Sequence, residues 1–482
     1  MKQRLKGLLA LVLSLVMVFA LATNAWAVVR IGGVEMGDGT TTTYYYNGTN
    51  GAQGSTSDTD TGNWNAKVER INGVQTLTLN NFTMVDNSHY EAISSDQDLT
   101  LNLIGDNEIT ASYLGSSGVV VAVSVTGKLA IEGTGSLNAD GTDSGLSASS
   151  GVDISGGKVT AEGDVYGIIS STGNVTITGG EVEATGRNSG INANNITISG
   201  GTVTATGSND NGYGIYALED NFNGGDITIS NGNVTAEGGR VGIGAEDAVT
   251  ITGGTVIAKG TTPTDSVGIH ASGRLGGELT ITGATVTATG GEYGINSSFH
   301  TGSSSGGEVV IKNSTVTAKA GADGTGIRVE GVIGKTIIQN STVDIGCKTG
   351  INSNYVAILA DSSVTIKSTD KAISCSGLSF ADATDPALSD STWYKWSTDN
   401  TNFTDSATTE LTKEITADTS TLYVVPLSAN TNPYPPIIYN PTPTPEPEKV
   451  DSAKTFDGGI GLYVTMSILS ATGGAWLAKK KD

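Results

Sequence analysis

Four carboxylates fall at related places in two neighbouring segments of this 482-residue chain. Asp140 and Asp143 follow one apolar anchor, and Glu162 and Asp164 follow the equivalent anchor of the next segment. If the two segments stack as adjacent strands, residues at equal offsets lie about 5 Å apart. Carboxylates this close repel one another unless a proton or a cation lies between them. Oxygen ligands of high charge suit Ca²⁺, so the four residues predict a calcium site, with side chains that splay into water as the alternative.

Tyrosines recur at one point of the same pattern. Tyr166, Tyr213 and Tyr293 each stand directly before a Gly-Ile pair. An aromatic ring offers a flat apolar face with a polar tip, and the C–H faces of pyranose sugars stack on such rings. The spacing therefore predicts a tyrosine row that binds carbohydrate. The alternative is a set of half-buried tyrosines that only cover a corner of the fold.

Catalytic groups are sparse. A polysaccharide lyase needs a basic residue beside carboxylates, and a glycosidase needs paired carboxylates around the scissile bond. His89, His270 and His300 lack metal-binding spacing, and we find no Ser-His-Asp, Cys-His or phosphate-loop pattern. The basic residues near the repeats stand alone: Arg187, Arg240, Arg274 and Arg328. We therefore expect no enzyme, with a polysaccharide lyase or hydrolase on the same scaffold as the enzymatic alternative.

The elements that position these residues are copies of one short phrase. It reads VTITGGEVEATG at 175–186 and ITISGGTVTATG at 196–207, and it recurs at spacings of 21–31 residues. Apolar β-branched residues alternate with threonines, which indicates strands rather than helices. Weaker upstream copies pair Leu103 with Ile109 and Ile131 with Leu137. Self-similarity at such a period predicts a stacked solenoid.

Each repeat contains three short strands. Two flank a Gly-Gly or Asn-Gly corner, where glycine supplies a positive φ, and the third is marked by the Gly-Ile pair. Three strands and three corners describe one coil of a parallel β-helix, so residues 77–385 predict an all-β solenoid of about twelve coils. Bare ends would expose sheet edges. We therefore expect small β caps at residues 28–76 and 386–430.

The two ends of the chain resemble targeting and anchoring segments. Residues 1–27 have the basic, apolar and small-residue regions of a secretory signal peptide. Residues 431–450 form a proline-rich linker. Residues 451–482 hold an apolar run followed by three lysines, which is long enough to cross a bilayer. We expect an exported protein that is anchored at the cell surface through this C-terminal segment.

Charge and cysteine content narrow the partners further. The formal net charge of −22 argues against binding nucleic acid or anionic lipid. It is compatible with calcium and with neutral glycans. Cys347 and Cys375 fall at different points of the repeat, so one disulfide bridge and two free thiols both stay open.

Two segments resemble known families. The block LTLNNFTM at 77–84, AISSD at 92–96 and LTLNLIGDN at 99–107, followed by the repeated phrase, resembles secreted clostridial-type carbohydrate-binding-domain proteins. That resemblance implies a right-handed parallel β-helix, similar in fold to pectate lyases, that binds plant polysaccharide and calcium. The C-terminal segment resembles a Gram-positive cell-wall sorting signal. Lys454-Thr455 fits this signal, whereas Ala453 and Phe456 depart from it, so sortase cleavage and a plain membrane tail both stay open.

Together these patterns favour an exported, surface-attached, non-catalytic protein for polysaccharide binding or adhesion, assisted by calcium. Its partner is expected to be a plant cell-wall or host glycan, and the chain is expected to be a monomer. A purely structural surface protein is the remaining alternative.

Overall fold

The computed structural model describes residues 28–426, apart from positions 38–39, 48–54, 58, 61, 114–117, 221–222, 275, 300–305, 360, 381–393, 407–408 and 410. All of these described residues lie in the compact unit Met1–Ala429. The predicted signal peptide, linker and C-terminal anchor lie outside the described residues. No helix among the described residues is long and apolar enough to span a membrane.

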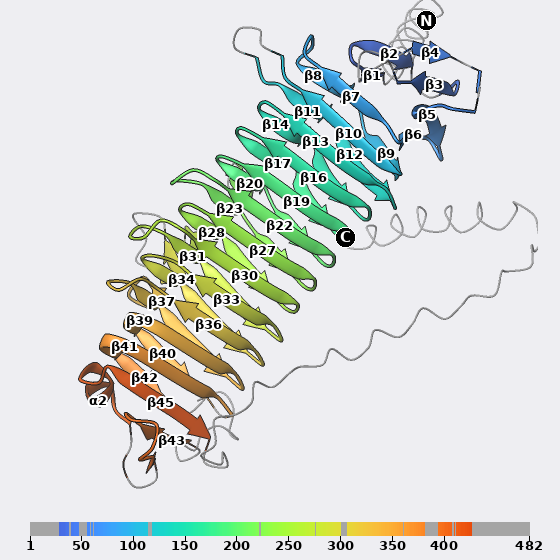
Figure 1. Ribbon diagram of the computed structural model, residues 1–482. Coiled ribbons are helices and arrows are strands. Elements are labelled where there is room, and N and C mark those ends of the chain that lie inside the picture. Colours follow the sequence, from blue (N-terminus) through green and yellow to red (C-terminus); the bar gives the residue numbers. More distant parts are fainter. Residues whose placement is uncertain are drawn as a thin grey trace, which may run out of the picture. The chain divides into compact units, whose positions relative to one another are not determined.

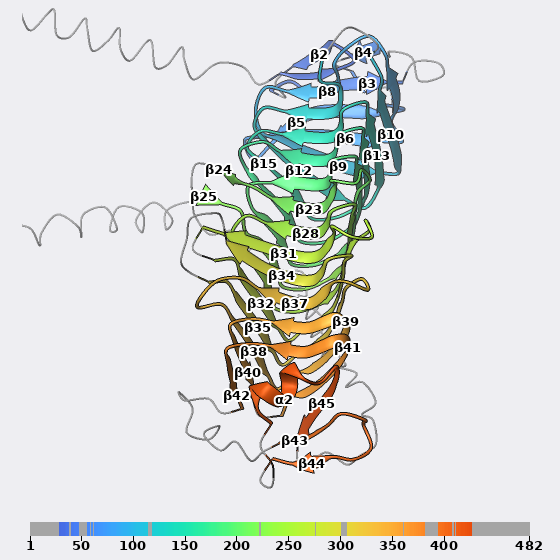
Figure 2. The same cartoon turned by 90° about the vertical axis from the view of Figure 1, so that its left-hand side faces the viewer.

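Each coil contributes a strand to each of three faces of the solenoid, and equivalent strands of successive coils pair side by side. We call these faces 1, 2 and 3 (Figures 1 and 2). Face 1 is a run of parallel strands in chain order. Its strands are β6 (Val74–Asn80), β9 (Leu99–Ile104), β12 (Lys128–Gly133), β15 (Gly151–Ile154), β18 (Asn174–Ile177), β21 (Ile196–Ile198), β26 (Ile227–Ile229), β29 (Ala248–Ile251), β32 (Glu278–Thr282), β35 (Glu308–Lys312), β38 (Lys335–Gln339), β40 (Tyr355–Ile358) and β42 (Gly377–Ser379).

Face 2 follows face 1 in every coil, across a sharp corner. Its strands pair in parallel with the equivalent strands of the coils before and after. They are β7 (Thr83–Asp86), β10 (Asp106–Ala111), β13 (Ser136–Gly141), β16 (Lys158–Gly163), β19 (Glu181–Gly186), β22 (Thr202–Gly207), β27 (Asn233–Gly238), β30 (Thr255–Gly260), β33 (Thr285–Thr289), β36 (Thr315–Lys319) and the first parts of β39 (Thr342–Asn352) and β41 (Ser363–Ser374).

Face 3 carries the Gly-Ile strands and completes each coil. The second parts of β39 and β41 belong to it, because both strands run on around the corner. Its other strands are β8 (Glu91–Ser95), β11 (Val121–Val125), β14 (Ser144–Ala148), β17 (Tyr166–Ser170), β20 (Ser189–Ala193), β23 (Tyr213–Ala217), β28 (Val241–Ala245), β31 (Val267–Gly273), β34 (Tyr293–Phe299) and β37 (Thr325–Val329). The prediction of an all-β parallel β-helix of about twelve coils is confirmed, since the described residues form twelve coils of three strands each.

Antiparallel strands close both ends of the described unit. At the N-terminal end, β1 (Val29–Ile31) pairs with β2 (Val34–Gly37) and β8. There β3 (Thr43–Tyr46) also pairs with β4 (Ser55–Ser57) and β5 (Ala66–Ile71). At the C-terminal end, β45 (Thr421–Pro426) pairs with β41 and with β43 (Tyr394–Ser397), which also pairs with β44 (Thr404–Asp405). The short helix α2 (Lys413–Ala417) and the hairpin β24 (Glu219–Asp220) and β25 (Asn223–Gly224) complete the elements.

The bore of the solenoid is filled by ladders of identical residues. On face 2 the valines Val182, Val203 and Val234 lie in register and are at most 1% exposed. On face 3 the isoleucines Ile191 and Ile215 do the same. Each coil buries its apolar side only against its neighbours, so the stability of the solenoid grows roughly with the number of coils.

In the central coils, the glycine of the Gly-Ile pair lies inward, directly against the backbone of face 2. A Cβ built on Gly214 would be 2.6 Å from the amide nitrogen of Glu237 and 2.7 Å from the carbonyl oxygen of Gly242. Glycine and isoleucine are therefore both buried, although they are consecutive. This interrupts the two-residue alternation of a strand, and the residues before and after the pair both face outward, as in the burial pattern of Tyr213–Ala217.

One buried polar group predicts a stabilising substitution. Thr336 occupies the position that valine holds in the coils on both sides, Val309 and Val356. It is fully buried, and its hydroxyl has no hydrogen-bond partner. Thr336→Val removes this unsatisfied group and keeps the shape, so we expect stability to rise by about 1 kcal/mol. Urea unfolding measures the change, and Thr287→Val on the outward side of face 2 is the matched control. A less stable Thr336→Val variant would contradict the assigned register.

Candidate binding face

Face 3 has two rows of outward positions along the solenoid, and some of their members, among them Ser189, Val241 and Asn192, are buried. The first row contains the residue that precedes each Gly-Ile pair, and the register places Tyr166, Tyr213 and Tyr293 in it. The coil of Ser189 separates Tyr166 from Tyr213. Two coils separate Tyr213 from Tyr293. Because coils rise by about 4.8 Å each, the gaps are about 10 and 14 Å. All three tyrosines are half-buried.

The second outward row contains the residue that follows each Gly-Ile pair. In chain order it holds Ser147, Ile169, Asn192, Tyr216, Gly244, His270, Asn296, Arg328 and Asn352. The two rows lie side by side, so face 3 is a strip with aromatic, amide and basic groups. Tyr216 follows a Gly-Ile pair and so lies outside the predicted tyrosine row, but the interrupted alternation at Gly214 turns it outward beside Tyr213.

Tyr213 and Tyr216 form a stacked pair at the middle of this strip. Their ring centroids are 4.0 Å apart and their planes differ by 17°. Gly244 in the next coil leaves the space that the Tyr213 ring uses, since a Cβ there would lie 3.0 Å from the ring. Because Gly244 has no side chain, the Tyr213 ring can lie flat against Tyr216. We call this stacked pair the ring platform.

Two charged side chains hold this platform at its hydroxyl ends. The Tyr216 hydroxyl donates to Glu246 Oε1 at 2.6 Å, and Arg240 Nη1 donates to the Tyr213 hydroxyl at 3.3 Å. Burial raises the pKa of Tyr216 far above its ordinary value, and the bond to Glu246 adds to the effect. The Tyr216 phenol therefore stays neutral in the physiological range and keeps its role as a donor to Glu246.

Tyr293 belongs to a second polar and aromatic cluster. The Arg328 guanidinium lies over the Tyr293 ring, 4.9 Å from its centroid, and donates to Asn296 Oδ1 at 3.4 Å. Arg328 also forms an ion pair with Glu330. Burial, followed by a hydrogen bond with Glu292, raises the pKa of Tyr293 to about 12. In this cluster the Arg328 guanidinium therefore covers one face of a neutral tyrosine ring.

A polar cleft of about 450 Å³ continues the strip toward the C-terminal coils. Its lining includes Arg328 and Glu330 from one coil, Asn352 and Asn354 from the next, and Cys375. Amide and hydroxyl groups dominate these walls. Such groups suit a ligand that is rich in hydroxyls, because each can donate or accept a hydrogen bond.

Both cysteines are free thiols in the structure. Cys347 is buried and Cys375 is half-buried. Burial raises the pKa of the Cys347 thiol to about 11 and raises that of Cys375 as well. Thiols with raised pKa values are poor nucleophiles at neutral pH.

The four predicted calcium ligands form two pairs. Asp140 and Glu162 are register partners on neighbouring strands of face 2. Asp143 lies beyond the end of β13, where it feels the charge of Asp164 from the next coil. Among the described residues, no group of three or more His, Cys, Asp or Glu side chains is arranged to hold a metal ion. The structure thus does not bring the four carboxylates together as one cluster.

The Asp143 carboxylate predicts a pH-dependent stability. Burial, and then the charge of Asp164, raise the pKa of Asp143 above its ordinary value of 3.8. A carboxyl whose pKa is higher in the folded state loses stabilising effect as pH rises through the range between its unfolded and folded pKa values. Asp143→Asn should therefore be more stable than the parent at pH 7, and this gain should fade as pH drops below about 4. Urea unfolding at both pH values measures it, and a gain that persists at low pH would contradict this cause.

The described geometry accords with a family comparison. The family model described as a beta helix repeat matches residues 152–173, 175–193, 196–215, 227–245, 249–273 and 279–298. The first match contains β16 and β17, and each later match likewise spans one coil. Searches of curated proteins and of solved structures gave no significant match. The central coils of this chain are therefore a tandem array of β-helix repeats.

Proposed function

We propose that this chain is an exported, surface-attached protein that binds polysaccharide without cleaving it, and that face 3 is its binding surface. The observation that carries the proposal is the stacked pair Tyr213 and Tyr216, for which Gly244 leaves room. A flat ring pair with a fixed orientation loses little conformational entropy when a ligand stacks on it. Sugar rings offer the matching flat C–H surface.

The surroundings of the pair suit a long glycan. Tyr166, Tyr293 and the polar cleft extend the strip over several coils in the direction of the solenoid axis. Polar side chains of the second row that reach the surface, such as His270, Arg328 and Asn352, lie farther along the same strip. Alternating rings and hydrogen-bonding groups along a strip favour an extended polymer over a compact ligand. The signal-like and anchor-like ends of the sequence support display of this strip at the cell surface.

Affinity electrophoresis tests the proposal. The tested segment is 28–429, because the described part of that segment contains both antiparallel ends and a continuous hydrophobic core. It is run through gels that contain plant cell-wall or host glycans, with and without calcium. We expect one class of glycan to retard the segment. Equal mobility in every gel would contradict polysaccharide binding, and retardation only with calcium would show that the ion takes part.

The absence of catalysis needs a separate test, because a basic residue, Arg240, and a carboxylate, Glu246, both bond to the tyrosines of the stacked pair. A basic residue near a carboxylate is the minimum that a lyase needs. Both side chains here already bond to tyrosine hydroxyls, which favours a positioning role. Incubation with pectin and calcium should therefore give no rise in the ultraviolet absorbance of unsaturated products. A rise that Arg240→Ala abolishes would establish the lyase alternative.

A further inference from the structure

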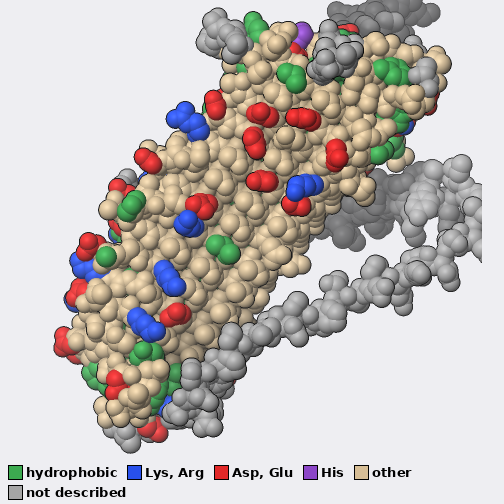
Figure 3. Space-filling model, in the orientation of Figure 1, with side chains coloured by type: hydrophobic (Ala, Val, Ile, Leu, Met, Phe, Trp, Pro, Cys, Tyr) green, Lys and Arg blue, Asp and Glu red, His purple; other side chains and the backbone are tan. Residues whose placement is uncertain are grey.

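On face 2, one row of outward positions has acidic residues at one end of the solenoid and lysines at the other. We call it the charge row. The register aligns the fifth residue of each strand, and the row reads Asp140, Glu162, Thr185, Thr206, Glu237, Lys259, Thr289, Lys319, Gly346 and Lys367 from β13 to β41. Acidic residues occupy the N-terminal half, and lysines occupy the C-terminal half. In the middle of the view in Figure 3, red side chains predominate toward the N-terminal coils and blue ones toward the C-terminal coils.

The rest of this face is flat and mostly uncharged. The neighbouring outward row runs through Thr160, Thr204 and Thr235 to Ile257, which is 44% exposed at the middle of the face. From Thr160 onward this row consists of β-branched side chains apart from Glu183 and Asp344, so the regular sheet presents few projections. Such a face can approach another flat sheet closely, as the sheets of a sandwich do at about 10 Å.

We propose that face 2 binds face 2 of a second copy of this chain in an antiparallel arrangement. The two-fold axis runs along the strand direction, so each row faces the same row of the partner in reversed order. When β27 of one copy lies opposite β30 of the other, Asp140 faces the partner's Lys367, and Glu237 faces the partner's Lys259. Symmetry repeats each of these pairs. Glu237 and Lys259 already form an ion pair within the chain at 2.9 Å, so the pairing joins two such pairs into a network.

The same register creates no opposition of like charges in the neighbouring row. Glu183 faces the partner's Thr317, and Ile257 faces the partner's Thr235. A parallel pairing would instead set the charge row against the row of Lys158 and Glu181. Glu162 would then face the partner's Lys158, but the pairs of Asp140 with Lys367 and of Glu237 with Lys259 would be lost. Charge complementarity of this kind selects one orientation and excludes others.

The face is large enough for a stable dimer. Coils about 4.8 Å apart from β13 to β41, with strands of about 3.3 Å per residue, give on the order of 800 Å² on each copy. That is about the area of a standard specific interface. The proposal departs from the monomer expected from the sequence, where the charge row is invisible because its members lie more than 20 residues apart. It does not depend on glycan binding, since face 3 stays open in such a dimer.

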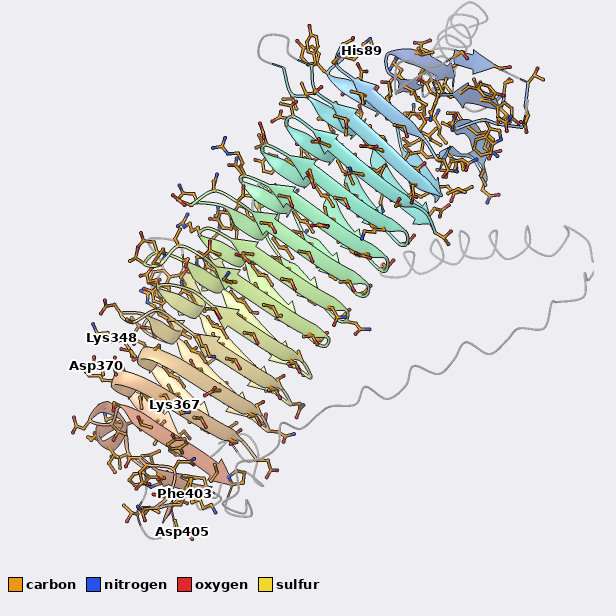
Figure 4. All side chains as sticks on the ribbon, in the orientation of Figure 1. His89, Lys348, Lys367, Asp370, Phe403 and Asp405 are labelled. Carbon is orange, nitrogen blue, oxygen red and sulfur yellow. The ribbon has the colours of Figure 1, made fainter. Side chains whose placement is uncertain are left out.

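Sedimentation equilibrium of segment 28–429 over a range of concentrations tests this pairing. We expect a monomer–dimer equilibrium. Asp140→Lys and Lys367→Asp should each weaken it by about tenfold or more, since each sets like charges opposite one another in both symmetric contacts. Lys367 lies on the exposed side of β41 (Figure 4), so these changes do not touch the core.

The charge-swapped double variant makes the test specific. Asp140→Lys combined with Lys367→Asp should restore dimerisation close to that of the parent, because the opposed charges again differ in sign. Lys312→Asp on face 1 alters the net charge as much as Lys367→Asp does and should leave the equilibrium unchanged. A segment that stays monomeric at all concentrations would overturn the proposal. A dimer that the single changes do not weaken, or that the double variant does not restore, would overturn it as well.

Discussion

Gly214→Ala is expected to lower the free energy of unfolding of segment 28–429 by about 3 kcal/mol, the upper part of the range for overpacking a core. The added methyl group would meet the backbone of Glu237 and of Gly242. Neither backbone can move without breaking the pairing of β27 with β22 or of β28 with β23. A flexible side chain could turn aside, but these contacts are with main-chain atoms. The coil would have to open toward face 3.

Urea unfolding followed by circular dichroism measures this effect. Gly346→Ala is the matched control, because a Cβ there meets only the Lys319 side chain at 3.9 Å. That variant should stay within about 0.5 kcal/mol of the parent. Equal stability of the two variants would mean that the glycine of the Gly-Ile pair does not lie against face 2, and the account of both outward rows would fail with it.

Tyr216→Ala is expected to weaken binding to the retarding glycan by about thirtyfold, the loss that follows from removing a central aromatic anchor. The substitution removes one ring of the stacked pair and leaves Tyr213 without its 4.0 Å neighbour. It also deprives Glu246 of the hydroxyl that donates to it. Both changes act on the ring platform, and the inward ladder of Ile215 is untouched.

Affinity electrophoresis at several glycan concentrations gives the dissociation constants of the parent and of Tyr216→Ala for the glycan. Tyr355→Ala is the matched control, because Tyr355 is 41% exposed on face 1 and lies outside both outward rows. Its affinity should equal that of the parent. If Tyr355→Ala weakens binding as much as Tyr216→Ala does, the binding surface cannot be confined to face 3.

The central coils were predictable because the local sequence of each repeat is enough to indicate its strands and corners. Around Ile177 and Val182, apolar and polar residues alternate with period two, which indicates strands. The glycines between them indicate a corner, and the repetition of the phrase indicates stacked coils. In the structure Ile177 lies in register with Ile198, and Val182 with Val203. Repeats of this kind depend on nearest neighbours only, which is why no long-range information was needed.

The N-terminal coils show where this reasoning fails. The apolar pattern aligned Ile109 with Leu137, but the register places Ile109 opposite Ala139 and Leu137 opposite Asn107. Asn107 is only 2% exposed, so a polar residue holds an inward position. It accepts from the Phe82 amide at 3.0 Å and donates to the Ser136 carbonyl at 2.8 Å. Hydrogen bonds to other coils satisfy this side chain, and no hydrophobicity pattern can report them.

The candidate face was predicted in part. Placing Tyr166, Tyr213 and Tyr293 before the Gly-Ile pair was enough to put them in one row. Tyr216 was missed because strict alternation places residues three apart on opposite sides of a strand. The inward glycine removes that rule, and a tyrosine on either side of a Gly-Ile pair is the signal that would have found the stacked pair.

Hydroxyl-radical footprinting of segment 28–429, with and without the retarding glycan, tests the binding face most directly. Mass spectrometry reads the oxidation of each tyrosine. We predict that the glycan protects Tyr166, Tyr213 and Tyr293 on face 3 and leaves Tyr355 on face 1 as reactive as before. Unchanged oxidation of the face 3 tyrosines in the presence of a glycan that binds, or protection of Tyr355 instead, would contradict the assignment of face 3 as the polysaccharide-binding surface.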